Sequence, residues 1–273
     1  MREFKLINAR GDTWNMNELD SFLHSPKGLG GERKQTYIQV GNRFKVTKDV
    51  MKQKAPTCKV AFSGYEEFNR FAKFIQHRPL VLEYTTPAGT YYMQVYIIKA
   101  TKTELETVGL QTELTFAGLT TWYKKISLEK PKQPANSKKY PYSYNYVYTD
   151  TERGTLKWTC ESTEDSPIRL SILGPCKNPM WVHRVDGKVV ASGRLRVDIE
   201  AGHRVVIDTT QMPFCIAEYT NRNVFVRDLY GFSDFETERF LFAGFGENRI
   251  TVIHEGIGDL QVAMEVQEEY AVV

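Results

Sequence analysis

Alternation of apolar and polar residues, the pattern of a half-buried β-strand, dominates the first part of the chain. The stretches that show it are FKLINARG, TYIQVGNRFKVTKDV, CKVAFSG, LVLEYTTPAGTYYMQVYIIKATKTELE and LQTELTFAG. They are rich in β-branched and aromatic residues, which pack well on a pleated surface. TTPAGT supplies a hairpin turn within the fourth stretch. We therefore predict half-buried strands in all of these stretches.

One stretch in this region has the 3.6-residue period of a helix instead. In GYEEFNRFAKFIQHRP, the residues expected on one face are Tyr65, Phe68, Ala72 and Ile75. Two glutamates in the first turn suit the helix dipole, and Pro79 ends the run. The pattern predicts one helix at about residues 65–77, packed on a β-sandwich.

The second part of the chain is a series of short strand-like segments separated by DG, SG, AG and GIG turns. These segments are NYVYTD, TLKWTC, IRLSILG, MWVHRVDGKVVASG, RLRVDI, HRVVIDT, NVFVRDLY, RITVIHE and LQVAMEV. VDGKVV is the clearest hairpin signal, with Asp186 and Gly187 at the turn. Many short strands at near-regular spacing predict a sandwich or jelly roll.

Between the two parts lies KPKQPANSKKYP, residues 130–141, with three prolines, four lysines and no aliphatic residue larger than alanine. Such a stretch cannot bury surface, so it is typical of an exposed linker. We predict a mainly β protein of two β-sandwich domains, residues 1–129 with one packed helix and residues 142–273.

The charge differs between the two parts. Residues 1–130 contain 20 Lys and Arg against 13 Asp and Glu, a balance of +7, whereas the remainder contains 16 against 20, a balance of −4. The overall charge of +3 is too small for the basic footprint of a nucleic-acid-binding protein. No run of eighteen apolar residues is present, so we expect no membrane span. The opposite signs indicate two domains with different neighbours.

The glycine-rich stretch PKGLGG, residues 26–31, is the first candidate for chemistry. A dinucleotide fingerprint needs a third glycine entering a helix, but Arg33 stands at that position and a strand-like run follows. A phosphate-binding P-loop also fails, because no Gly-Lys-Ser/Thr closes the segment. What remains is a tightly turned or flexible stretch of backbone.

Catalytic and metal-binding motifs are weak throughout the chain. The four cysteines are far apart with no C-x-x-C pair, which favours free, buried thiols. The five histidines never occur at the spacing of a metal-ligand pair, and no G-x-S-x-G elbow is present. The sequence does not exclude a pair of carboxylates for glycoside hydrolysis, because the two members of such a pair need not be close in sequence. We expect no catalytic residue, no metal and no cofactor.

Aromatic residues are the most suggestive feature of the second part. YPYSYNYVY, residues 140–148, has tyrosines at alternate positions, which a strand would place on one side. Such a row serves a core, a subunit contact or sugar binding. Trp181 and Tyr230 are the candidates for contact with a sugar or a partner.

The order of segments in the first part resembles the distal tail protein (Dit) family of long-tailed phages that infect Gram-positive bacteria. FKLINARG, PKGLGG, CKVAFSGYEEFNRFAKFI, LVLEYTTPAGTYYMQVYIIKATKTE and GLQTELTFAGLTTWYKK follow one another as in that family, over residues 1 to about 126. SPIRLSILGPCKNPMWVH, HRVVIDT and GENRITVIHEG are similar, more loosely, to its C-terminal galectin-like sandwich.

This resemblance implies a structural protein of the virion, made in the host cytoplasm and built into the tail tip or baseplate. It implies a hexameric ring without catalysis, with the tail tube protein on one face and the tail-associated hub or lysin protein on the other. The C-terminal domains would support receptor-binding proteins, and neither membrane nor sequence-specific nucleic acid is a partner. The +7 domain would border the tube and ease the passage of nucleic acid.

The same resemblance implies which residues contact a neighbouring subunit or partner. They are Pro26, Lys27, Gly28, Leu29, Gly30, Gly31, Trp122 and Tyr123. PKGLGG would act as a joint beside a ring-forming strand, where glycines let two backbones approach closely. The main alternative is a lectin-like adhesion module that binds sugars through the aromatic residues of the C-terminal domain. An enzyme acting on wall polymers is a weaker alternative, since the sequence nominates no acid or nucleophile.

Overall fold

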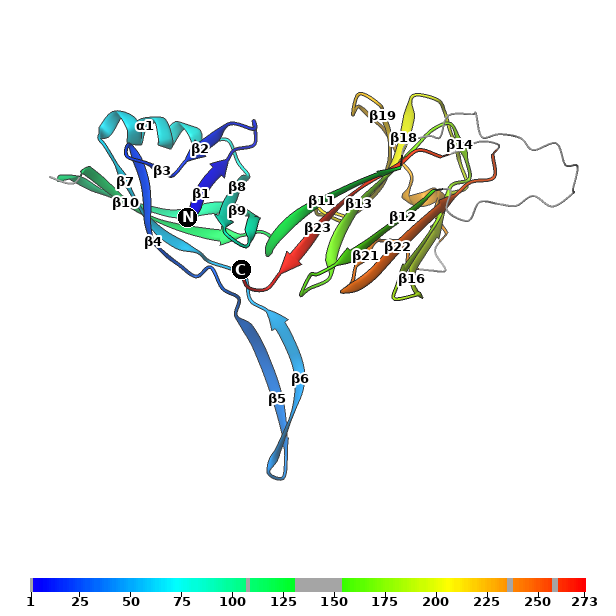
Figure 1. Cartoon of the computed structure of the whole chain (residues 1–273), viewed down its shortest axis with the longest axis horizontal. Helices are drawn as coiled ribbons and strands as arrows, with labels where there is room; N and C mark the ends of the chain where they lie inside the picture. The colour runs from blue at the N-terminus through cyan, green and yellow to red at the C-terminus, as the bar shows by residue number, and fades with distance from the viewer. Residues whose placement is uncertain (1, 107–108, 131–153, 235–237, 257–259) are drawn as a thin grey trace, which may run out of the picture. The chain divides into compact units, whose positions relative to one another are not determined.

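The computed structural model describes residues 2–106, 109–130, 154–234, 238–256 and 260–273 (Figure 1). The chain forms two compact units, which we call the first unit (residues 1–124 and 269–273) and the second unit (residues 125–268). Residues 125–129 were predicted in the first domain but belong to the second unit, and residues 269–273 were predicted in the second domain but belong to the first unit. The predicted linker, apart from Lys130, and the tyrosine row at 140–148 lie outside the described residues. The division at residues 129 and 141 stays a prediction.

The first unit is built on one antiparallel sheet, in the order β2-β1-β8-β9-β10-β7-β4-β3. Its strands are β1 Glu3–Ile7, β2 Thr13–Asn15, β3 Asn17–Glu18, β4 Ser21–Lys27, β7 Thr57–Phe62, β8 Leu80–Thr86, β9 Gly89–Glu106 and β10 Gly109–Gly118. The long strand β9 pairs with β8 through residues 89–95 and with β10 through residues 95–106. This exchange of partners along one strand lets the sheet curl around a core.

The single α-helix of the described chain, α1 (Tyr65–Phe74), covers this core. Phe71 is its most buried aromatic residue, with ring centroids 5.1 Å from Phe62 and 5.4 Å from Trp14. The helix itself is confirmed, but it is shorter than the predicted 65–77 and its buried face is rotated. Tyr65, which we expected on that face, is 43% exposed. The aromatic rings of residues 68, 71 and 74 decide the orientation because they offer more apolar area than an alanine does.

A two-stranded hairpin forms its own small sheet between β4 and β7. It consists of β5 (Arg33–Val40) and β6 (Arg43–Met51), and we call residues 33–51 the arm. Figure 1 shows the arm extending away from the rest of its unit. The expectation of half-buried strands is wrong here, because every residue of β5 is exposed and only Met51 of β6 is partly covered. The alternating pattern indicates strands correctly but carries no information about what covers them.

The second unit contains two sheets that share one core. The first has the order β20-β19-β18-β13-β23, with β20 Phe225–Asp228, β19 Cys215–Thr220, β18 His203–Asp208, β13 Ser166–Leu173 and β23 Val262–Tyr270, and β11 (Trp122–Lys130) borders β23. The second has the order β12-β22-β15-β16, with β12 Thr155–Cys160, β22 Gly246–Ile253, β15 Met180–Val185 and β16 Lys188–Arg194. Short elements complete the unit: β14 Cys176–Lys177, β17 Asp198–Ile199, β21 Phe242–Ala243 and the 3-10 turn η1 Tyr230–Phe232.

The core of the second unit draws on both sheets, with Ile168, Leu170 and Ile172 from one and Ile250 and Val252 from the other, all at most 1% exposed. The hairpin predicted at VDGKVV is confirmed between β15 and β16, and both residues of its turn have positive φ, at 48° and 79°. The predicted fold class, mainly β with one packed helix in the first half, is confirmed. Within the described chain, no helix combines the length and the apolar character needed to span a membrane.

Candidate assembly site at the base of the arm

The glycine-rich stretch that leads into the arm has an unusual backbone. Strand β4 ends at Lys27, and Gly28 follows with φ of 72°, a left-handed conformation that a side chain would strain. A Cβ at Gly28 would lie 3.1 Å from the carbonyl oxygen of Ala55 on the returning chain. The two passes of backbone therefore approach closely where the arm leaves the body of the first unit, and we call residues 26–31 the joint.

Two buried side chains hold the joint in place. The indole Nε1 of Trp122 donates a 2.7 Å hydrogen bond to the carbonyl oxygen of Leu29. The ammonium of Lys54, which is only 5% exposed, donates to the carbonyl oxygens of Ala271 at 2.6 Å and of Gly30 at 3.4 Å. A buried ammonium is costly unless acceptors surround it, so Lys54 favours the conformation in which both segments meet.

Residues 269–273, which we call the strap, form the other side of this site. A Cβ at Gly31 would lie 2.4 Å from the carbonyl oxygen of Ala271, so only glycine fits there without displacement. Thr121 donates to the carboxylate of Glu269 at 2.8 Å. The ammonium of Lys124 lies 5.3 Å from the ring centroid of Tyr270. The strap thus connects the joint to strand β11.

The structure brings the predicted contact residues together, but not all of them on the surface. Lys27, Gly28, Gly30 and Gly31 are exposed, and Pro26 and Leu29 are partly buried. Trp122 and Tyr123 are 0% and 1% exposed, so their expected contact with a neighbouring subunit is corrected. Both belong to the core of this chain, where Trp122 positions the joint from inside. The sequence offered no signal for Lys54 or for the strap, since both act over long separations.

The arm presents an apolar surface that nothing in the described chain covers. On one face Tyr37 lies opposite Val46 and Gln39 opposite Phe44, and the three apolar side chains are 52%, 46% and 67% exposed. The other face alternates apolar with basic residues, because Ile38 lies opposite Lys45 and Val40 opposite Arg43. A two-stranded ribbon is marginally stable alone in water, and exposed apolar groups on it mark an interaction surface.

In the second unit, the two residues expected to contact a sugar differ in solvent exposure. Trp181 is 0% exposed, and its Nε1 donates to the carbonyl oxygen of Arg239 at 3.1 Å, so its role as a sugar contact is corrected. Tyr230 is 41% exposed and stacks on Phe240 with the ring planes 18° apart. The aromatic composition of the sequence could not distinguish the buried ring from the exposed one.

The packing of Trp181 against Gly193 gives a stability prediction. A Cβ at Gly193 would lie 2.3 Å from Cζ2 of Trp181, so Gly193→Ala forces the indole or the strand to move. We expect the free energy of unfolding of the second unit to fall by about 1–3 kcal/mol, as in other overpacked cores. Urea denaturation followed by tryptophan fluorescence measures it. Gly231→Ala is the control, because no atom lies within 4 Å of its added Cβ; equal midpoints for both variants would contradict this packing.

A buried carboxylate stands out in the electrostatics of the second unit. The side chain of Glu218 is 3% exposed and accepts hydrogen bonds from His203 Nδ1 at 2.5 Å and from Arg227 Nε at 2.7 Å. Burial alone raises the pKa of Glu218, but the hydrogen bonds and charges of His203 and Arg227 outweigh it and leave the pKa below its usual value of 4.5. These contacts join β18, β19 and β20 into one ionic cluster.

This cluster predicts acid-dependent stability. A carboxylate with a lowered pKa in the folded state stabilises the fold above its unfolded pKa, and this contribution is lost as the pH falls below about 4.5 and through the folded value. We expect Glu218→Gln to lower the melting temperature at neutral pH and the difference from wild type to shrink in acid. Calorimetry between about pH 7 and pH 3 tests it. A difference that is constant over this range would contradict the assignment.

Metal-ligand clusters are absent from the described residues, and two of the buried thiols are poorly reactive. No group of three or more His, Cys, Asp or Glu side chains is placed to hold a metal ion in the described part of the chain. Burial raises the pKa of the Cys58 thiol to about 12 and that of Cys176 to about 11, so both remain protonated and are poor nucleophiles at neutral pH.

Comparison with known proteins gives two results. Residues 3–119 match the sequence model of the N-terminal domain of the distal tail protein family. No curated protein matches the sequence significantly.

Solved structures resemble the whole chain. A chain of the phage P2 baseplate in its activated conformation with calcium is 17% identical, covers 100% of both chains and has a TM-score of 0.69. The SPP1 Dit (gp 19.1) protein is 8% identical over 97% of this chain and 98% of its own, with a TM-score of 0.56. It is described as a paradigm of the hub adsorption apparatus in phages infecting Gram-positive bacteria. At such identities the similarity concerns the fold alone.

Proposed function

Because the chain belongs to the distal tail protein family, we propose that it forms a hexameric ring joining the tail tube to the tail-associated hub protein of a phage that infects Gram-positive bacteria. It is a structural protein of the phage tail and baseplate. The ring, its symmetry and its neighbours are the proposed part. Catalysis has no role in this proposal.

The exposed apolar face of the arm is the main observation that supports the proposed ring. Its face of Tyr37, Phe44 and Val46 is exposed in the single chain, and no described residue covers it. In a closed ring each subunit offers one arm and receives one, so a heterologous contact covers every such face. Within the described chain no third strand pairs with β5 or β6, which allows strand pairing with a second copy of this chain.

The joint and the strap hold the base of the arm in one position, which would orient the arm toward the neighbouring subunit. The hydrogen bonds from Trp122 to Leu29 and from Lys54 to Gly30 and Ala271 fix the place where the arm leaves the body of the first unit. Fixing the base reduces the conformational entropy that the arm loses when it docks. The buried Trp122 therefore supports assembly from within the subunit.

The two units take different roles in this proposal. The first unit, in the part of the chain with a balance of +7, borders the passage for nucleic acid through electrostatics that do not read a sequence. The second unit supports receptor-binding components. A lectin role would need a site other than Trp181, which is buried.

The joining role is tested by co-expression of the full chain with the tail tube protein and, separately, with the hub protein of the same phage. We expect each partner to co-purify with the ring in buffer of about 0.15 M salt, where weak surface charge contacts are screened. A ring that retains neither partner would contradict the proposed role even if the ring itself forms.

A further inference from the structure

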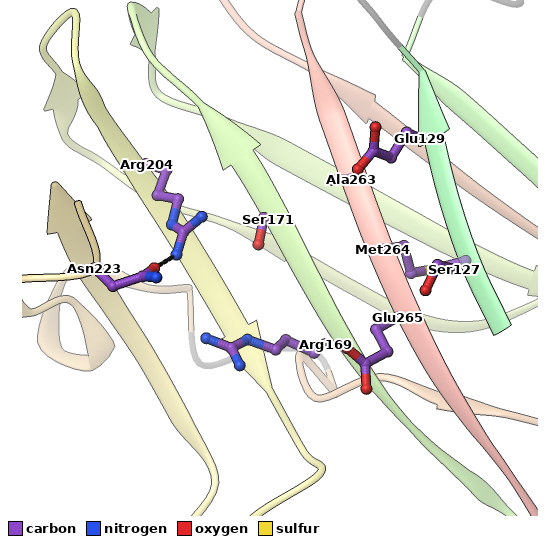
Figure 2. A pocket seen from close by; sticks show the side chains of 9 residues that line it. All are labelled: Ser127, Glu129, Arg169, Ser171, Arg204, Asn223, Ala263, Met264 and Glu265. Atoms are coloured by element: carbon purple, nitrogen blue, oxygen red, sulfur yellow. Dashed lines mark hydrogen bonds between the residues drawn. The ribbon is translucent and has the colours of Figure 1, made fainter. Parts of the chain in front are cut away.

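A polar groove of about 290 Å³ lies on the outer face of a sheet in the second unit (Figure 2). Ser171 on β13 and Ala263 on β23 lie directly opposite each other and form part of its floor. The next outward-facing pair along the same strands is Arg169 opposite Glu265, whose side chains are long. Two short side chains beside two long ones leave the hollow.

The charged side chains of the groove are separated by sign. Figure 2 shows the guanidinium groups of Arg169 and Arg204 on the β18 side, and the carboxylates of Glu129 and Glu265 toward β11 and β23. The Nε of Arg169 lies 3.6 Å from the buried carboxylate of Asp208, whereas neither glutamate has an ion pair among the described residues. The groove therefore offers hydrogen-bond donors on one wall and acceptors on the other.

Arg204 is the residue whose bonding is least satisfied in this groove. Its Nη2 donates to the side-chain oxygen of Asn223, but its Nε is buried without a hydrogen-bond partner in the described chain. Arg204 also has no carboxylate within ion-pair distance among these residues. A buried donor without a partner costs free energy, and because this Nε is enclosed by protein, a ligand in the groove would meet Arg204 through its terminal Nη1 and Nη2 atoms.

We propose that this groove binds a saccharide that carries an oxyanion, a carboxylate or a phosphate. The oxyanion would pair with Arg204, since a guanidinium holds such groups with two parallel hydrogen bonds. The sugar hydroxyls, each a donor and an acceptor, would bridge Glu129 and Glu265 on one wall and Arg169 on the other. This site is independent of the ring contact and of the proposed joining role.

The geometry is less suited to a peptide. Strands β13 and β23 are paired on both sides within the sheet, so their backbone groups leave no edge for an added strand. Peptide docking also relies on an apolar side chain anchored in a pocket. Here the apolar lining consists of the small Ala263 and of Met264, which is 3% exposed.

The test is binding of the full-length chain to an array of uronic-acid oligosaccharides, phosphorylated oligosaccharides and neutral oligosaccharides of equal length. We expect acidic probes to bind at least about tenfold more tightly than neutral ones, the value of one hydrogen bond to a charged group. Arg204→Gln should lower acidic binding about tenfold or more. Arg184→Gln, on β15 of the other sheet, is the matched control and should bind like wild type.

Three results would overturn the proposal: no oligosaccharide retained, equal affinity for citrate and for the acidic oligosaccharides, or preference for an acidic peptide. Citrate separates a bare anion site from a saccharide site. Calorimetric melting of Arg204→Gln is the folding control, and we expect little loss of stability, because the substitution removes an exposed hydrogen bond to Asn223 and no ion pair among the described residues.

Discussion

A chain carrying both Phe44→Glu and Val46→Glu is expected to stay folded but to lose its ring. Both residues lie on the apolar face of the arm, 67% and 46% exposed in the single chain. Burying such a side chain contributes about 1.5–3 kcal/mol, so losing two weakens each subunit contact at least about 100-fold. The added charges oppose burial further. Sedimentation velocity over a range of concentrations measures the effect.

The matched control is Lys45→Glu, which changes the charge on the opposite face of the same strand. We expect it to change assembly far less, since exposed charges contribute little to association. Circular dichroism should be unaltered for both variants, because the mutated arm residues are exposed. Rings that persist undiminished in the double variant would remove the arm from the interface.

Trp122→Ala is expected to be the most destabilising single substitution in the first unit. The indole is 0% exposed within the core and also donates to the carbonyl oxygen of Leu29. Removing a buried tryptophan side chain costs about 3–5 kcal/mol. The joint should loosen as well, which hydrogen exchange of residues 28–31 would show. Denaturant unfolding measures the loss of stability.

Trp122→Phe separates the two roles of this residue. It keeps most of the packing but leaves the Leu29 carbonyl without its donor, so we expect a loss of about 1–3 kcal/mol together with faster exchange in the joint. If the phenylalanine variant exchanges at the wild-type rate in residues 28–31, Trp122 does not position the joint. A surface role for the indole would instead predict little loss of stability in either variant.

The sequence pattern predicted the positions of the strands better than it predicted which of their side chains are buried. Period-two alternation located β5 and β6, but the same alternation suits a sheet face that covers a core and an arm that another molecule covers. Aromatic composition likewise selected Trp181 and Tyr230 together, although one is 0% and the other 41% exposed. Burial depends on the packing of distant segments, which a local period does not encode.

Only part of the assembly site at the base of the arm could be predicted from the sequence. The glycines of PKGLGG indicated a close approach of two backbones, and the structure places one approach against Ala55 and another against Ala271. Lys54 had no signal, because a lysine in an ordinary polar stretch gives no hint of burial. Its partner Ala271 lies 217 residues away, and such a contact follows only from the complete fold.

The groove under Arg204 was not visible in the sequence at all. Its residues come from separate strands, and the hollow arises because Ser171 meets Ala263 in the strand register. Register of this kind depends on the pairing of β13 with β23, which are far apart in the chain. Periodic patterns along the sequence therefore predicted the fold class, and the family resemblance implied the joint, whereas surfaces formed by several strands follow only from the complete fold.

The mass of the purified full-length chain in solution, measured by native mass spectrometry, tests the central claim most directly. The ring account predicts a dominant species at six times the 31.5 kDa of one chain, with monomer appearing in the Phe44→Glu, Val46→Glu variant. A wild-type chain that remains monomeric at every concentration tested would contradict a ring held by its own arm.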